Sequence, residues 1–122
     1  MSDARSEMEQ SPKERADTVL AIRLISQSVV NLTASQLRAV PVTAAILDGP
    51  LPSAYSEAMA TGNTDLARAY VTQTAKFLAP YIESNRDPIR AALARILAAE
   101  MGEMSFATAL HRRLRDMDVI RW

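Results

Sequence analysis

Apolar residues in the first quarter of the chain recur every three or four positions, which is the period of a helix with one buried face. The segment opens with Ser11 as a capping residue, Pro12 suited to the first helical position and Glu14 able to close a capping box. We therefore predict a helix over residues 12–31. Its apolar stripe is expected to comprise Val19, Ile22, Ile25 or Ser26, Val29, and Leu32 or Thr33.

The next stretch has no clear period. A second capping sequence at residues 33–36 predicts a short helix that reaches Val40, and Pro41 is expected to end or bend it. Residues 42–47 form a short apolar run, and we assign them to a helical turn because a lone strand would leave its backbone unpaired. Residues 48–50, Asp-Gly-Pro, predict a firm break.

Two further helices are expected in the middle of the chain. One runs from Pro52 to about Ala60, with Gly62 just beyond its end. The next is capped at Asn63 and should stop or kink at Pro80. The face of this second helix is expected to comprise Leu66, Tyr70, Gln73 or Thr74, Phe77 and Tyr81.

The C-terminal third predicts two more helices. Asp87 and Pro88 are a strong start signal for a helix that reaches Met101. Its stripe is the cleanest in the chain: Ile89, Ala92, Leu93, Ile96, Leu97 and Met101. Ser105 then caps a last helix that fades near Asp116, with a stripe of Phe106, Leu110 and Leu114.

Five or six helices joined by loops of about two to six residues predict an irregular all-α bundle in a single domain. Residues 1–10 have no periodicity and are expected to form a disordered tail, which leaves residues 11–122 as the helical domain. A length of 122 residues fits one such domain.

Composition adds an expectation about association. The chain is rich in alanine and only 5% aromatic, so its core is expected to be thin and to gain from a partner, with a homodimer as the simplest case. The formal charge is zero, with 14 basic and 14 acidic residues, whereas dedicated nucleic-acid binders usually carry a basic excess. Nucleic acid is therefore the less expected partner.

Candidate chemistry is sparse. The chain has no cysteine and one histidine, His111, so thiolate catalysis and multi-histidine metal sites are excluded. Its three glycines are isolated and form no phosphate loop. We expect no cofactor and no catalytic site. Since no apolar run suits a signal peptide or a membrane span, a cytoplasmic location is expected.

The predicted contact surface is the last helix with its tail. This helix carries a basic cluster at His111, Arg112, Arg113 and Arg115, which either meets an anionic partner or complements the helix dipole. An apolar chain end needs something to pack on, and packing on a partner or on its own domain are equally open. The residues assigned to this surface are Phe106, Leu110, Arg112, Leu114, Arg115, Ile120 and Trp122.

These features predict a small, non-catalytic helical interaction protein: a regulator, inhibitor or adaptor that binds another protein. In size, helicity and lack of a catalytic signature the chain is similar in type to small bacterial or phage regulators such as quorum-sensing antiactivators. Two alternatives remain open. One is a nucleic-acid-binding module that uses the C-terminal basic helix. The other is a helical ligand-binding protein or enzyme in which Arg23, Arg38, Arg68 and Arg95 converge.

Overall fold

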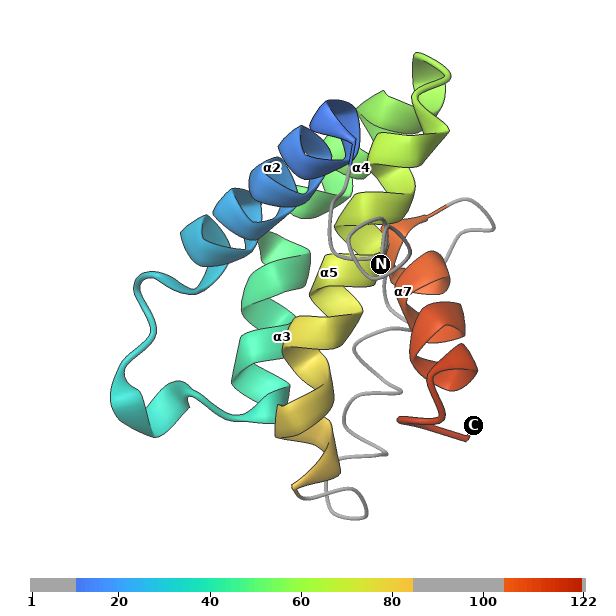
Figure 1. Ribbon diagram of the computed structural model, residues 1–122. Coiled ribbons are helices and arrows are strands. Elements are labelled where there is room, and N and C mark those ends of the chain that lie inside the picture. The colour runs from blue at the N-terminus through green and yellow to red at the C-terminus, as the bar shows by residue number, and fades with distance from the viewer. Residues whose placement is uncertain (1–10, 85–104, 122) are drawn as a thin grey trace, which may run out of the picture.

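A computed structural model describes residues 11–84 and 105–121. These residues form five α-helices and one 3₁₀ turn, with no strand among them, packed as an irregular bundle (Figure 1). The all-α, single-domain prediction is confirmed. The predicted tail 1–10, the predicted helix 88–101 and Trp122 lie outside the described residues. The elements are α2 (Pro12–Val29), η1 (Ala34–Gln36), α3 (Ala39–Asp48), α4 (Leu51–Ala60), α5 (Thr64–Glu83) and α7 (Phe106–Asp116).

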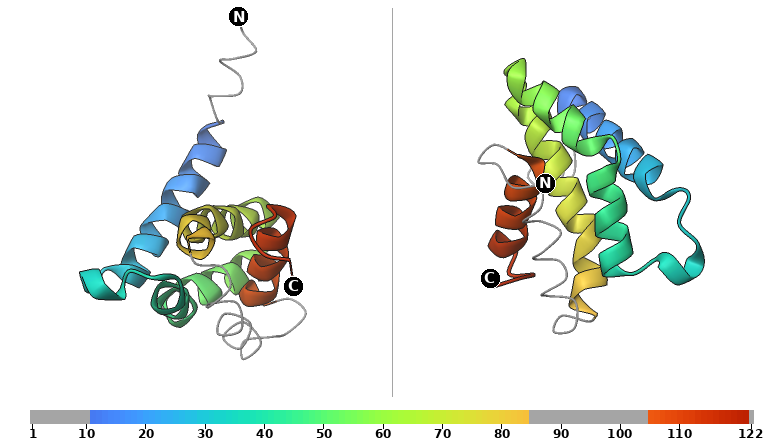
Figure 2. Two further views of the ribbon diagram at one scale, coloured as in Figure 1. Left: turned by 90° about the horizontal axis from the view of Figure 1, so that it is seen from below. Right: turned by 180° about the vertical axis from the view of Figure 1, so that it is seen from behind.

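Helix α5 is the central element. It contacts α2, α3, α4 and α7, and two views show α2 along one edge of the bundle and α7 along the opposite edge (Figures 1 and 2). At 20 residues it is about 30 Å long, enough to pass between the other helices. Its buried residues are Ala67, Tyr70, Val71, Thr74, Ala75, Leu78 and Ile82.

The predicted face of α5 is therefore only partly correct. Tyr70 and Thr74 are buried, whereas Leu66, Phe77 and Tyr81 are half-buried. Compared with the predicted side, the buried side of α5 is rotated toward its alanine residues, because small side chains let neighbouring helices approach closely.

Helix α5 also continues past Pro80 to Glu83, so the predicted stop near Ala79 is wrong. Proline lacks the N–H that would bond to the carbonyl of Lys76, but both residues are exposed, so water can satisfy that carbonyl.

Pro41 likewise does not end a helix. It is the third residue of α3, where the missing N–H would have no intrahelical partner, so the proline fits the first turn. Residues 42–47 thus belong to a helix of ten residues rather than to a single turn. The short helix expected over 33–40 is reduced to the 3₁₀ turn η1, although its capping box is present, with Thr33 N–H donating to Gln36 Oε1 at 2.9 Å.

The predicted caps at Ser11, Asn63 and Ser105 and the predicted glycine after α4, Gly62, are confirmed. In the capping box of α2, Glu14 N–H donates to Ser11 Oγ at 3.1 Å and Ser11 N–H to Glu14 Oε1 at 3.0 Å. Gly62 follows α4 with φ +79°, the left-handed conformation that closes helices, and Asn63 N–H donates to the carbonyl of Ala58 at 2.8 Å. Side chains of Asn63 and Ser105 cap α5 and α7.

The predicted stripe of α2 is only partly correct. Ile25 is buried, and Val29 and Leu32 are partly buried against the core, but the other buried residue of the helix is Ala21. Val19 and Ile22, which were assigned to the buried stripe, are 49% and 48% exposed. The helix carries apolar residues on two sides, and α3, α4 and α5 cover only one of them. The other apolar side faces outward.

The packing makes a simple prediction for stability. Leu110 on α7 is fully buried, so Leu110→Ala should lower the free energy of unfolding by about 2–5 kcal/mol through lost burial and the cavity left behind. Val30 is 71% exposed, and the matched truncation Val30→Ala should change it by no more than about 0.5 kcal/mol. Urea unfolding measures both; equal losses would contradict the burial of α7.

Candidate functional site

The apolar part of the predicted contact surface lies inside the domain. Phe106, Leu110, Leu114 and Ile120 are 2%, 0%, 2% and 5% exposed, and the ring of Phe106 packs against Tyr55 at 5.6 Å between centroids. They are core residues in this fold and are not accessible to a partner. The sequence leaves open whether the C-terminal end packs on a partner or on its own domain. For these four residues the structure supports packing on its own domain.

The chain after α7 turns back on the helix. Asp118 adopts φ +61°, and the N–H groups of Val119 and Ile120 both donate to the carbonyl of Leu114, at 2.9 and 3.4 Å. This turn places Val119 and Ile120 in the core. Arg121 at the surface pairs with Asp118 at 3.2 Å.

Of the described residues in the predicted set, Arg112 and Arg115 are exposed, and Trp122 lies outside the described residues. Arg112 and Arg115 lie on the outer side of α7, and Arg113 and Arg115 occupy its last turn, where positive charge complements the helix dipole. Asp116 and Asp118 follow directly, so the local charge is mixed.

Three of the large apolar side chains that are exposed in the described residues lie elsewhere, on α2 and at its C-cap, Val30. Val19, Ile22 and Val30 are 49%, 48% and 71% exposed, and they share the outer side of this helix. We call this surface the α2 face and define it by its exposed residues Ala16, Val19, Ile22, Arg23, Ser26 and Val30. Its N-terminal half forms a shallow depression of about 460 Å³ that includes Ala16, Val19 and Arg23.

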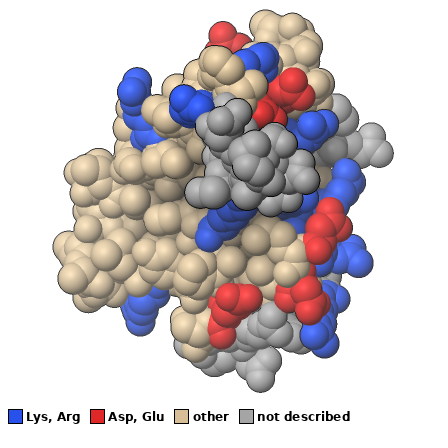
Figure 3. All heavy atoms as spheres, in the orientation of Figure 1, with Lys and Arg blue, Asp and Glu red and all other residues tan. Residues whose placement is uncertain are grey.

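The surface next to the α2 face is almost free of charge. Between Arg23 and Asp48 the only charged residue is Arg38. The space-filling view accordingly shows a broad surface without charged side chains where η1 and α3 lie (Figure 3). Leu37, 43% exposed, belongs to this region and lines a groove of about 540 Å³ with Arg38, Val40, Pro41 and Tyr81 among its walls.

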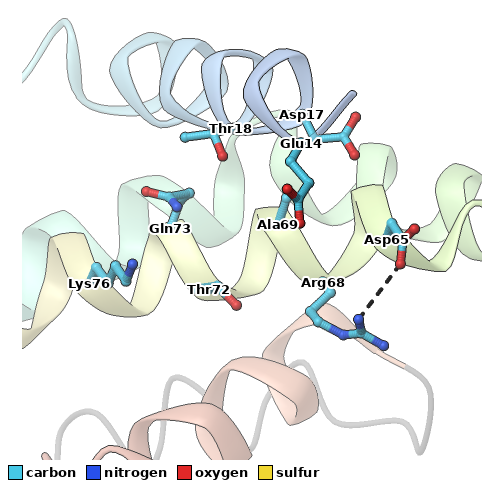
Figure 4. A pocket seen from close by; sticks show the side chains of 9 residues that line it. All are labelled: Glu14, Asp17, Thr18, Asp65, Arg68, Ala69, Thr72, Gln73 and Lys76. Carbon is cyan, nitrogen blue, oxygen red and sulfur yellow. Dashed lines mark ion pairs between the residues drawn. The ribbon is translucent and has the colours of Figure 1, made fainter. Parts of the chain in front are cut away.

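A polar groove of about 270 Å³ runs between α2 and α5. Glu14 and Thr18 point into it from α2 and Gln73 points back from α5 (Figure 4). Its charges compensate one another. Arg68 pairs with Asp65 at 3.6 Å, and Lys13 reaches Asp17 at 3.1 Å and Asp65 at 3.9 Å. The ion pair between Lys13 and Asp65 therefore links α2 to α5 beside this groove.

The arginines proposed to converge are not brought together. Arg23, Arg38 and Arg68 line three separate depressions, and Arg95 lies outside the described residues. Within the described ranges, no group of three or more acidic or histidine side chains could hold a metal ion, and no helix is long and apolar enough to cross a bilayer.

The sequence analysis missed the α2 face as a surface. The available signal was that α2 has more apolar positions than one buried side requires: Ala21, Leu24 and Ile25 on one side, Val19, Ile22 and Val30 on the other.

No protein-family model, curated protein or solved structure matches this chain, so the inference about function depends on these surfaces alone.

Tyr70, at the centre of α5, has a shifted pKa. Burial raises the pKa of its phenol, and the negative charges of Asp17 and Glu57 raise this pKa further. The folded state therefore holds the neutral phenol. The neutral phenol contributes fully to the free energy of unfolding when the pH is below its pKa in the unfolded state, about 10. This contribution is lost as the pH rises through the higher pKa of the folded state.

We expect the wild-type protein to lose stability above pH 10 more steeply than the Tyr70→Phe variant, which has no phenol to ionise. Urea unfolding at a series of alkaline pH values gives the two slopes. Tyr81→Phe, at a half-buried position on the same helix, is the matched control. Parallel wild-type and Tyr70→Phe profiles would show that the buried phenol does not contribute.

Proposed function

We propose that this protein is a non-catalytic regulator or adaptor that binds another protein through the α2 face. The observation that carries the proposal is the exposure of Val19, Ile22 and Val30 along one side of one helix. Single exposed apolar residues are ordinary, but a row of them along a helix is typical of a surface that a partner covers.

The α2 face also suits binding because none of the residues that define it is buried in the described part of the bundle. The opposite side of α2 holds the helix in the bundle through Ala21 and Ile25, and the polar groove adds ion pairs to α5. Substitutions on the α2 face should therefore change binding without changing the fold, which makes the proposal testable.

The nucleic-acid alternative has weaker support. Its candidate arginines, Arg112 and Arg115, are exposed, but Asp116 and Asp118 lie beside them and the chain has no net positive charge. Phosphate recognition depends on an uncompensated basic surface, since released counterions supply most of its free energy.

Ile22→Ser should remove capture of the partner, because it replaces the central apolar side chain of the α2 face, and should change the free energy of unfolding by about 0.5 kcal/mol or less. Leu37→Ser is the matched control: it is the same kind of change at a similarly exposed residue outside the α2 face. Affinity capture from the native host, quantified by mass spectrometry for wild type and both variants, provides the comparison. A protein that wild type and Ile22→Ser capture in equal amounts does not bind the α2 face. If every captured protein behaves in this way, the proposal is wrong.

A homodimer, expected from the alanine-rich composition, is the second candidate for what covers this face. The large apolar residues of α7 are buried, so among the residues that the structure describes the large exposed apolar side chains are Val19, Ile22, Val30 and Leu37. Light scattering at tens of micromolar protein measures the mass directly. A dimer that Ile22→Ser dissociates would show that a second copy covers the α2 face, whereas a monomer would leave the face to a different protein.

A further inference from the structure

We propose that the α2 face binds an amphipathic helix of another protein that carries a carboxylate at the centre of its apolar stripe. This inference rests on the proposed function and adds the chemistry of the partner. It depends on the spacing of the residues on the α2 face, on the position of one arginine within that spacing, and on the place of the acidic side chains of α2.

The spacing is that of a helix-pairing seam. Five positions on the α2 face are separated by three, four, three and four residues, the heptad pattern that keeps one line of side chains against a partner helix. They are Ala16, Val19, Arg23, Ser26 and Val30. Alanine and serine are small enough to let a second helix approach closely, and Ile22 flanks the seam with a large apolar side chain.

Arg23 occupies the centre of this seam. It is exposed, and it forms no ion pair with another of the described residues. A helix laid along the seam would cover it, and burying a guanidinium without a counter-charge is strongly unfavourable. A carboxylate at the facing position of the partner would accept hydrogen bonds from the guanidinium in a two-pronged arrangement.

The acidic residues of α2 cannot supply that counter-charge. Glu14 and Asp17 lie on the side of α2 that lines the groove toward α5, and Asp17 is paired with Lys13. The charge of the α2 face is therefore positive only, and complementarity requires an acidic partner.

The same geometry disfavours a second copy of this chain. In an antiparallel pair the two kinds of seam position face each other, so Arg23 would face Val19 or Ser26 of the second copy and would be covered without a counter-charge. An in-register parallel pair places the two Arg23 side chains together. Like charges at the centre of a helix interface oppose association.

The test is selection from a displayed library of amphipathic helices with heptad-spaced apolar residues and all amino acids allowed at the central seam position. The full chain is the bait, as wild type, Arg23→Glu and Arg112→Glu. We expect Asp or Glu at the centre with wild type, and Lys or Arg with Arg23→Glu. Arg112→Glu reverses an exposed charge on α7 and should select as wild type does. A Glu-centred helix should bind Arg23→Glu about 30-fold or more weakly than wild type.

Other results overturn the inference in distinguishable ways. If the selected helices require Ile22 for binding but show no preference for Asp or Glu at the central position, the partner's carboxylate is refuted and the proposed function is unaffected. If no recovered helix depends on Ile22, both fail. If the protein sediments with phosphatidylserine vesicles and Arg23→Glu abolishes this binding, the α2 face binds an anionic membrane instead. If the wild-type protein is a dimer that Ile22→Ser dissociates, a second copy covers the face.

Discussion

The bundle depends on the burial of one long side of α5. Seven residues of this helix are buried, and every other described α-helix packs against it. Three of its contacts are made by small residues, Ala67, Thr74 and Ala75, which are 0–2% exposed and allow the neighbouring helices to come close. Because alanine buries little area, much of the stabilisation has to come from the large side chains that close the core around it, such as Leu78, Leu110 and Phe106.

This arrangement explains why the large apolar residues of α7 and of the turn after it are buried. An alanine-rich central helix needs large apolar residues from its neighbours, and Phe106, Leu110, Leu114 and Ile120 supply them. Helix α2, on the opposite edge, contributes Ala21 and Ile25 to the core, with Leu20, Leu24 and Val29 partly buried against it. Its exposed apolar residues Val19 and Ile22 are not part of this packing.

The sequence predicted the helix ends better than the helix faces. Caps at Ser11, Asn63 and Ser105 depend on hydrogen bonds between residues three positions apart, so local sequence specifies them. Which apolar side of a helix turns inward depends on neighbours distant in sequence. The spacing assigned Val19 and Ile22 to the stripe of α2 together with Ile25, whereas the buried residues are Ala21 and Ile25. The spacing likewise assigned Phe77 and Tyr81, rather than Ala75 and Leu78, to the core side of α5.

The attachment of α2 to α5 affects how this helix moves. Its first turn, at residues 12–16, is fully exposed and is tied to α5 through the surface contacts of Lys13 with Asp65 and Asn63. Exposed ion pairs contribute little and weaken further in salt, so this end of α2 opens at a small free-energy cost, and its amide protons should exchange with solvent sooner than those around Ile25. A ligand that binds only the closed helix would slow that exchange in proportion to its occupancy. Protection of the α2 backbone is thus a direct physical reporter of whether the outer side of the helix is covered in solution.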